Sequence, residues 1–315
     1  MGNLTHKHTL QWLLKGCFVP IDKPRGPPSA QVGQWVREII GAEKNGHIGT
    51  LDPNVSGVLL VGINKAVRLS RYLSGQDKEY VGIMHLHRDV EHKKIIEVVK
   101  SFQGRITQKP PLRSAVAKKL RERTVRRIDV LEIEGRDVLM RVECEGGTYI
   151  RKLMFDIGKK LGCGANMLEL RRIRSGAVGE NRCVSLYDLQ AAVRKWKEQG
   201  DESLLRNMLI PPDEILCLEK IVVKESALPS LAYGSPIYRS GLAAVKNDGV
   251  DATKVKEGKC AAVDYAGRGK DVIVYSESGV FCGVAEVIDG PEMYAKLRVN
   301  WLDPGEFGKK WKENK

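Results

Sequence analysis

The sequence of 315 residues lacks any long hydrophobic run, since no stretch approaches the roughly 18 consecutive apolar residues that cross a membrane. Its first residues, MGNLTHKHTL, lack the basic-then-apolar layout of a signal peptide. Seven cysteines are scattered without CxxC spacing and without the framework of a small secreted protein. These absences exclude the membrane and secreted classes, so we expect a cytoplasmic protein with reduced cysteines and no membrane partner.

A convincing set of metal ligands is also missing. His85, His87 and His92 are the nearest approach to one. Alternation along a strand accounts for the first two, and no further residues complete a ligand set. We therefore expect no bound metal.

Acidic charge is scarce relative to basic charge. The net charge is +13 and the isoelectric point is near 9.4, which favours a polyanionic partner. Residues 1–219 carry 37 basic and 26 acidic side chains, whereas residues 220–315 carry 15 and 13. The basic surface is therefore expected on the first two-thirds of the chain.

Helical and strand patterns are interspersed without a regular βαβ repeat. A helix is expected over 29–42, capped by Ser29, and another over 148–162 with an apolar face; a buried strand is expected over 58–63. Ser185 and Asp188 indicate a capping box. The pattern predicts an α+β fold with a mixed or antiparallel sheet. After Pro211 and Pro212, short β-type runs separated by glycines indicate a small barrel-like domain.

One polar loop carries an isolated carboxylate. In GHIGTLDPNVSGVLL, residues 46–60, Asp52 precedes a proline, and Asp-Pro is a common turn starter whose side chain accepts backbone N–H groups. Here His47 and Thr50 flank it, glycines allow another chain to approach closely, and an apolar strand follows that would hold the loop rigid. The context favours a chemical role over a turn alone.

This segment resembles the signature of the TruB family of RNA pseudouridine synthases. DKPRGPPS at 22–29 resembles the first family motif, with Pro28 where Thr is more usual, and KEY at 78–80 resembles the second. GGTYIRKLMFDIG and LRRIRSG resemble the last ones. GKCAAVDY and GVFCGVAEV are similar to a PUA RNA-binding domain. The segment 109–130 is similar to the guide-RNA-dependent, dyskerin-like branch, and the short length without long lysine-rich extensions is typical of its archaeal form.

The resemblance implies a domain order and an active site. The expected parts are an N-terminal arm at 1–17 that can pack on the PUA domain, a catalytic domain at 18–213, a PUA domain at 214–303 and a basic tail at 304–315. Asp52 would be the nucleophile and Arg151 the cation that keeps it ionised while it is partly desolvated. Tyr80 would stack on the uracil and pass a proton, and Leu170 would pack on the opposite face of the base. On pattern alone, Arg151 also fits a solvated helix start, and the other two fit core positions.

Further residues are implied in RNA binding. His47 would hold the RNA beside the flipped nucleotide, although a lone loop histidine is unremarkable, and Tyr149 belongs to the same motif as Arg151. Lys23 would support the catalytic loop unless it is a surface lysine. The run at 118–127 has six basic side chains in ten, and a solvated face is the alternative to phosphate contact. The residues expected there are Lys118, Lys119, Arg121 and Arg123.

The implied activity is isomerisation of uridine to pseudouridine in rRNA or tRNA, without a cofactor, directed by a box H/ACA guide RNA. The implied partners are a small zinc-ribbon protein, a glycine/arginine-rich-domain protein and a kink-turn-binding ribosomal-type protein. One alternative is a stand-alone synthase that acts on the tRNA T-loop. Another, from a different class, is a non-catalytic RNA scaffold.

Overall fold

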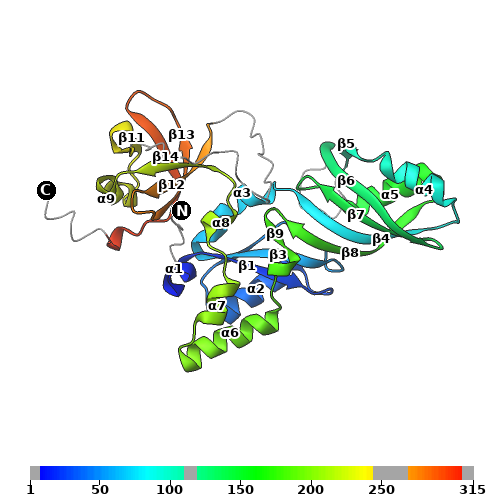
Figure 1. Cartoon of the computed structure of the whole chain (residues 1–315), viewed down its shortest axis with the longest axis horizontal. Coiled ribbons are helices and arrows are strands. Elements are labelled where there is room, and N and C mark those ends of the chain that lie inside the picture. Colours follow the sequence, from blue (N-terminus) through cyan, green and yellow to red (C-terminus); the bar gives the residue numbers. More distant parts are fainter. Residues whose placement is uncertain (1–7, 110–118, 244–268, 307–315) are drawn as a thin grey trace, which may run out of the picture. The chain divides into compact units, whose positions relative to one another are not determined.

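The computed structural model describes residues 8–109, 119–243 and 269–306. Two compact units make up the chain (Figure 1). One comprises Leu13–Ile210, and the other comprises Met1–Trp12 together with Pro211–Lys315. The motif residues of the sequence analysis up to 176 therefore fall in the first unit.

A mixed sheet of nine strands forms the first unit. The strand order is β1-β3-β8-β4-β7-β6-β5, with β2 paired to β3 and β9 to β8. Strands β3 and β8 run parallel, and the other pairs are antiparallel. The strands are β1 (Phe18–Lys23), β2 (Asn45–Ile48), β3 (Ser56–Ile63), β4 (Lys78–Leu86), β5 (Gly104–Gln108), β6 (Arg121–Glu134), β7 (Asp137–Cys144), β8 (Ala165–Ser175) and β9 (Val178–Gly179).

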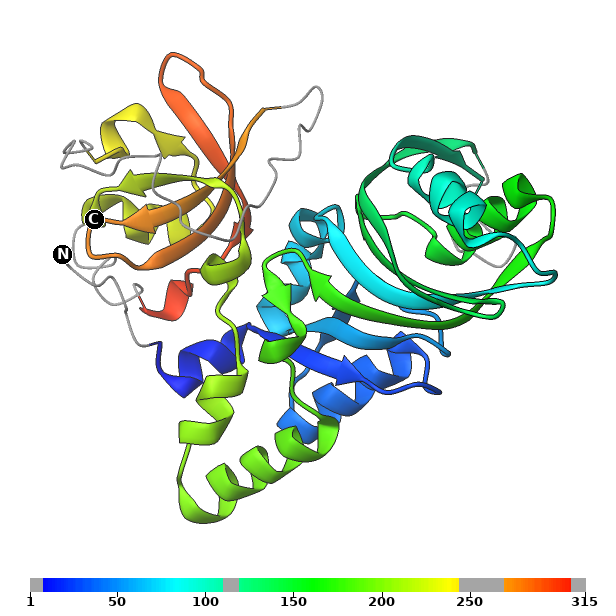
Figure 2. The same cartoon turned by 45° about the vertical axis from the view of Figure 1, so that its right-hand side comes forward.

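Helices cover this sheet in two groups. Figure 2 shows the sheet curling around α4 and α5, while α2 packs against α6 elsewhere in the unit. The helices are α1 (Leu10–Lys15), α2 (Ser29–Ile40), α3 (Ser70–Ser74), α4 (His92–Lys100), α5 (Ile150–Leu161), α6 (Leu186–Gln199) and α7 (Ser203–Met208), with 3₁₀ turns at Asn64–Leu69 and Glu180–Arg182.

Local sequence explains the elements that carry the site. Strand β3 is buried at every position after Ser56, because neighbouring strands and helices cover both of its faces. Helix α5 buries Ile150 and Leu153 on the expected apolar stripe and ends at Gly162 in a left-handed conformation. The Ser185–Asp188 capping box is confirmed. The expected cap by Ser29 is wrong: Pro28 is the N-cap residue and Ser29 already belongs to the helix.

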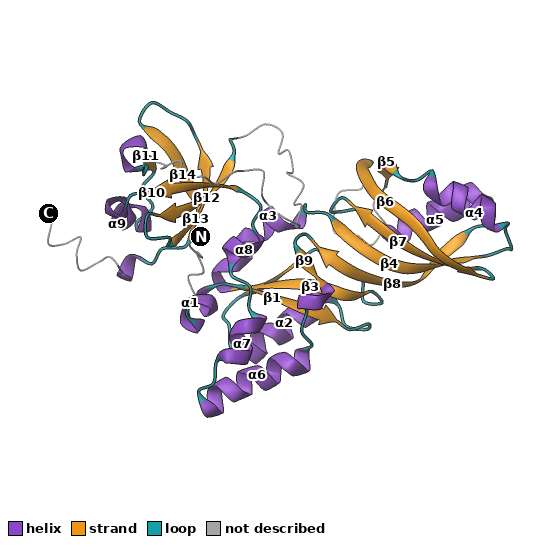
Figure 3. Ribbon diagram, in the orientation of Figure 1, coloured by secondary structure: helices purple, strands orange, loops and turns teal. Residues whose placement is uncertain are grey.

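A second, five-stranded sheet forms the other unit, with order β10-β12-β13-β14-β11 (Figure 3). Trp12 lies with this unit, its ring 6.4 Å from Phe281 and 6.0 Å from Trp301. The elements are β10 (Glu219–Val223), β11 (Ile237–Tyr238), β12 (Asp271–Ser276), β13 (Phe281–Val287), β14 (Met293–Asn300), α8 (Pro212–Ile215), α9 (Leu228–Ala232) and 3₁₀ turns at Glu225–Ala227 and Arg239–Gly241.

The predicted α+β class with a mixed sheet is confirmed. The C-terminal part, which the sequence predicted as a small barrel-like domain, contains a curled, half-barrel sheet (Figure 3). Among the described residues, no helix is long and apolar enough to cross a membrane. Among the described residues, Cys17, Cys144, Cys163, Cys183 and Cys282 are free. In the described ranges, no three His, Cys, Asp or Glu side chains gather as a metal site; His85 instead contacts Asp137 at 2.6 Å.

Candidate active site

Asp52 lies in the loop that joins β2 to β3. The backbone N–H of Val55 donates to the carbonyl of Asp52 at 2.9 Å, so the Asp-Pro segment does form a turn. Directly after the loop, β3 passes close to β8 at Gly57, where φ is +99° and a Cβ atom would lie 2.2 Å from the carbonyl oxygen of Arg172. Only glycine allows this approach. The loop is therefore held against β8 by its backbone.

Two buried side chains anchor the same loop. Lys23, at the end of β1, is fully buried and donates from Nζ to the carbonyls of Pro53 and Val55 at 3.1 and 2.8 Å. The surface-lysine alternative is thereby excluded. The Ser29 hydroxyl donates to the Leu51 carbonyl at 2.8 Å and accepts from the Leu51 N–H at 2.9 Å. The hydroxyl expected to cap α2 thus holds the residue that precedes the carboxylate.

Arg151 reaches Asp52 from the first turn of α5. Nη2 of Arg151 lies 3.2 Å from Oδ2 of Asp52, although 99 positions separate them in the chain. Their side chains are 55% and 46% exposed. The carboxylate is therefore half exposed in this structure, and the expected desolvation would have to come from a bound substrate. The contact places a carboxylate beside a guanidinium group.

Tyr80 and Leu170 lie on adjacent strands, β4 and β8, and both are buried. Leu170 is paired with Gly82, where a Cβ atom would lie 2.7 Å from Cδ1 of the leucine. Because alternate residues of paired strands share a face, Tyr80 and Leu170 project from the same side of the sheet. Burial raises the pKa of Tyr80, while the Arg172 guanidinium opposes this rise. The phenol therefore remains protonated at neutral pH.

His47 and Tyr149 lie close in the chain to Asp52 and Arg151, respectively. His47 lies on β2, and its Nε2 is 3.1 Å from the Thr50 hydroxyl, while burial and then Arg172 lower its pKa. Tyr149 is the N-cap residue of α5 and is partly exposed. Both residues thus lie next to a loop or helix end that carries one partner of the ion pair.

The family follows from comparison with known proteins. Residues 37–150 match the TruB family pseudouridylate synthase (N terminal domain), and residues 151–217 match the tRNA pseudouridylate synthase B C-terminal domain. The chain is 41% identical to the probable tRNA pseudouridine synthase B of Methanopyrus kandleri, over 91% of this chain and 86% of that protein. It is 43% identical to the Archaeoglobus fulgidus protein of that name, over 91% and 90%. The chain belongs to the TruB family of pseudouridine synthases.

Solved structures agree with this assignment. A chain of the "Crystal Structure of a Cbf5-Nop10-Gar1 Complex" has a TM-score of 0.80 and 38% identity, covering 95% of this chain and 89% of that one. A chain of the "Structure of H/ACA RNP bound to a substrate RNA containing 2'-deoxyuridine" has a TM-score of 0.77 and 35% identity, covering 95% and 89%. The predicted enzyme class, an RNA pseudouridine synthase, is confirmed.

Two buried cations of this TruB-family enzyme were missed from its sequence. Arg172 is 1% exposed and donates to the carbonyls of Val58 and Gly49 at 2.7 and 2.8 Å. It therefore ties the two ends of the Asp52 loop to β8. Lys78 is 3% exposed, and burial, followed by the charge of Arg172, lowers its pKa to about 7. Arg172 belongs to the LRRIRSG motif and Lys78 to the KEY motif. Membership of these motifs was the available signal, but it did not distinguish a buried cation from an exposed one.

The basic run does not form one free cationic face. Lys118 lies outside the described residues, Lys119 is exposed, and β6 begins at Arg121. Arg123 approaches Glu145 at 3.7 Å, and Arg126 contacts Asp77 at 3.2 Å. Such pairing leaves less positive charge for phosphates than the sequence indicates. Lys119 and Arg121 thus remain the better candidates for phosphate contact.

Proposed function

We propose that this pseudouridine synthase uses Asp52 as its nucleophile, with Arg151 keeping the carboxylate anionic. The observation that carries the proposal is their 3.2 Å contact, close enough to the buried Tyr80 for the Asp52 charge to act on its phenol. A guanidinium interacts more favourably with an anionic carboxylate than with a neutral one, and this attraction strengthens where a bound base excludes water. The pair therefore places a carboxylate nucleophile beside a fixed positive charge.

In this scheme the target uridine leaves its stack and enters between Tyr80 and Leu170. Base flipping costs a few kcal/mol, which contacts to the flipped base offset. Asp52 forms a covalent bond to the nucleoside, the N1–C1′ bond breaks, and the uracil turns so that C5 bonds to C1′. The C5 proton is lost, N1 gains a proton, and the carboxylate is released. Because the product is an isomer of uridine, no redox cofactor is consumed.

Each remaining residue has a role in the proposal. The protonated Tyr80 phenol starts as a hydrogen-bond donor to the base, and its ring supplies a stacking surface. His47 and Tyr149 contact the RNA beside the flipped nucleotide, and Lys23 holds the catalytic loop. Lys118, Lys119 and Arg121 contact phosphates; Arg123 contributes less because Glu145 is near it.

We further propose that a box H/ACA guide RNA selects the target uridines in rRNA or tRNA. Support comes from the structural relatives, which are described as Cbf5-Nop10-Gar1 and H/ACA particles. The C-terminal β-rich unit would be a PUA domain that binds the guide RNA. The partners would correspond to the zinc-ribbon, glycine/arginine-rich-domain and kink-turn-binding proteins that the sequence resemblance implies.

Stand-alone modification of tRNA is the second candidate. It is favoured by the names of the relatives from Methanopyrus kandleri and Archaeoglobus fulgidus, both probable tRNA pseudouridine synthase B. A stand-alone enzyme finds its target without base pairing from a second RNA. The two candidates therefore differ in what must be added to the reaction.

The deciding experiment measures pseudouridine in a radiolabelled rRNA fragment and in a tRNA transcript, with and without guide RNA and partner proteins. Guided action predicts product at the guide-complementary uridine only when guide RNA is present. Product in tRNA from the bare enzyme alone, with none in the guided reaction, supports the stand-alone candidate. Asp52→Asn should give no product in either reaction while still binding RNA. Full activity of this variant would support a nucleophile other than Asp52.

A further inference from the structure

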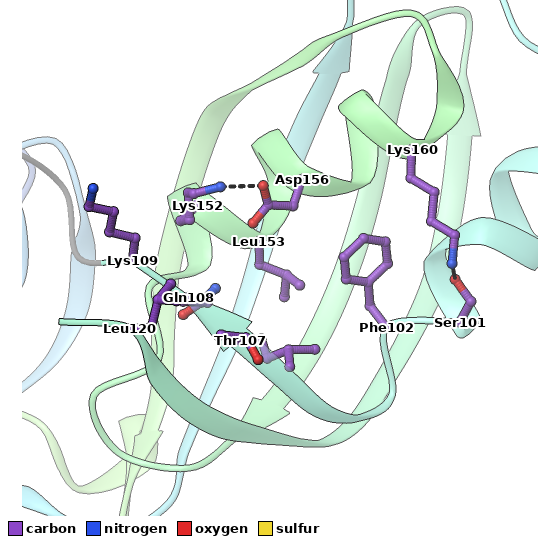
Figure 4. A pocket seen from close by; sticks show the side chains of 11 residues that line it. Ser101, Phe102, Thr107, Gln108, Lys109, Leu120, Lys152, Leu153, Asp156 and Lys160 are labelled. Carbon is purple, nitrogen blue, oxygen red and sulfur yellow. Dashed lines mark hydrogen bonds and ion pairs between the residues drawn. The ribbon is translucent and has the colours of Figure 1, made fainter.

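Gln108 is a buried amide at the end of β5, and only 2% of it is exposed. Its Nε2 donates to the Tyr149 carbonyl at 3.1 Å, and its Oε1 accepts from the Tyr149 N–H at 3.0 Å. One side chain therefore satisfies both backbone groups of a residue 41 positions away. Figure 4 shows Gln108 beside the first turn of α5, near Lys152 and Leu153.

Tyr149 is the N-cap residue of α5, and its own side chain makes no capping hydrogen bond. The first turns of a helix have backbone N–H groups without partners inside the helix and are prone to fraying. The Tyr149 carbonyl also accepts from the Leu153 N–H at 2.9 Å, so Gln108 binds the residue that starts the helical ladder. It thus fixes the position at which α5 begins.

Arg151 follows two residues later and is more than half exposed. An exposed ion pair between flexible side chains contributes little to stability, so it does not by itself hold the guanidinium in one place. The direction of that side chain depends instead on the backbone from which it projects. The first turn of α5 sets the direction, and Gln108 holds this turn from outside the helix.

The other partner of the ion pair is held in the same way. Ser29 bonds to both the N–H and the carbonyl of Leu51, which directly precedes Asp52. Like Gln108, Ser29 is 2% exposed. A buried polar side chain thus binds both backbone groups of a residue just before each member of the pair. These two independent pairs of backbone hydrogen bonds point to control of the distance between Asp52 and Arg151.

We propose that Gln108 is a positioning residue that orients Arg151 toward Asp52 by clamping the backbone of Tyr149. The inference rests on the proposed function of the Asp52–Arg151 pair and adds a specific role outside the family motifs of the sequence analysis. Gln108 does not touch the reacting atoms. Loss of its two hydrogen bonds lets the start of α5 shift, and displacements near 1 Å in a reacting centre can lower rates by about 10²-fold.

The principal test is Gln108→Met, which keeps the length of the side chain and removes both hydrogen bonds. Single-turnover rates of pseudouridine formation are measured at saturating protein, together with the affinity for the same RNA, using the full chain with the components that its activity requires. We expect the rate to fall about 10- to 100-fold with RNA affinity changed less than about twofold. An unchanged rate in folded protein would overturn the proposal.

Asn64→Ala is the matched control. Asn64 lies at the far end of β3 from the Asp52 loop; its Oδ1 accepts from Glu43 and Lys44 N–H groups at 2.9 and 3.1 Å, and its Nδ2 donates to the Leu14 carbonyl at 2.8 Å. The control therefore loses a comparable set of backbone hydrogen bonds. It should lose stability but keep the rate. Equal rate losses in both variants would make Gln108 an ordinary stabilising residue.

Gln108→Glu gives a readout that a purely structural role does not predict. A protonated carboxyl group can donate to the Tyr149 carbonyl and accept from its N–H, whereas the ionised form only accepts. Below the pKa of the new carboxyl the rate should approach that of the wild type, and it should fall as pH rises. A constant rate ratio to the wild type between pH 5.5 and 8.5 at about half-unit steps would contradict the clamp.

A double-mutant cycle with Arg151→Lys separates this inference from the proposed function. If Gln108 acts through Arg151, the loss caused by Gln108→Met should shrink to less than about threefold in the Arg151→Lys background. A full, additive loss in both backgrounds would refute action through Arg151. If Arg151→Lys alone keeps the full rate, the proposed role of the ion pair fails, whatever Gln108 does.

Discussion

The Asp52–Arg151 ion pair and the cations Lys23 and Arg172 have opposite environments. Asp52 and Arg151 are about half exposed, whereas Lys23 and Arg172 are buried almost completely. The exposed pair can meet an incoming base. The buried cations instead bind backbone carbonyls of the loop that carries Asp52. Exposure therefore separates the side chains available for chemistry from those that hold them in place.

This difference has energetic consequences. A half-exposed ion pair contributes little to stability, because water screens it and side-chain entropy opposes it. A buried carbonyl that loses its only donor costs about 1–3 kcal/mol. Substitutions in the exposed pair should therefore change turnover more than stability, and substitutions of the two buried cations should have a larger effect on stability.

The largest effect on turnover is expected from Arg151→Lys. Lysine keeps the positive charge but loses the planar donor array that faces the carboxylate. We expect turnover to fall by about 10²- to 10³-fold, with the free energy of unfolding changed by less than about 1 kcal/mol. Single-turnover assays, RNA-binding titrations and urea denaturation measure the three quantities. Equal losses of RNA binding and turnover would make Arg151 a binding or folding residue.

Lys23→Met should show the opposite signature. The change removes a buried donor from the carbonyl groups of Pro24, Pro53 and Val55, of which the Pro53 carbonyl still accepts from the Gly26 N–H. We expect the free energy of unfolding to drop by about 2–5 kcal/mol, measured by urea denaturation of the wild type and variant. Unchanged stability would contradict the claim that the buried cations contribute more to stability than the exposed ion pair.

The burial of Lys78 should make the free energy of unfolding depend on pH. Its pKa is about 7 in the folded protein and 10.5 in the unfolded chain, so above pH 7 the unfolded state binds more protons. Stability contributed by this group is present above 10.5 and is lost as pH falls through 7. The contribution of Lys78 to the free energy of unfolding should therefore rise by about 2 kcal/mol from pH 7 to 9, measured as the difference between the wild type and Lys78→Met at each pH.

The upper limit of this measurement is set by the buried thiols. Burial raises the pKa of Cys144 to about 12, so its contribution to stability is lost as pH rises above 9, the value for an unperturbed thiol. The two effects have opposite signs, and Lys23, whose pKa burial also lowers, adds to the rise, so the difference between the wild type and Lys78→Met is what isolates Lys78. A rise of the same size in Lys78→Met would assign it to another group.

The smallest effect concerns phosphate contacts. Replacing both Lys119 and Arg121 with Gln should reduce the slope of log affinity against log salt by about 1–2. Replacing Arg126, which already pairs with Asp77, should change it less. RNA affinities at several salt concentrations measure the slopes. Equal slopes in the wild type and the Lys119/Arg121 variant would assign those two side chains to solvent.

The sequence predicted those parts of the site that follow from local pattern or motif. The apolar stripe of α5 and the buried strand β3 follow from hydrophobic spacing, which is retained in any fold that buries those faces. Asp52, Tyr80 and Arg151 were identified through family motifs. Ser29 was assigned to a helix cap, because a cap is a local interaction and its true partner, Leu51, lies 22 residues away.

The buried polar network was beyond the reach of such patterns. Gln108 bonds across 41 residues and Arg172 across 114 and 123, and no periodicity in the chain signals either contact. Lys78 and Arg172 would ordinarily be expected at the surface, since charged side chains are seldom fully buried. Their burial depends on strands that pair only in the folded protein.

By itself, the sequence determined the α+β class, the pseudouridine synthase family and the identity of the charged pair, because these depend on composition, spacing and motif. The tertiary structure alone decided that Asp52 and Arg151 meet and that Lys23, Ser29, Gln108 and Arg172 hold the segments that carry them. The physical reason is that a buried donor must find an acceptor wherever the fold brings one, and that acceptor is set by the pairing of distant strands.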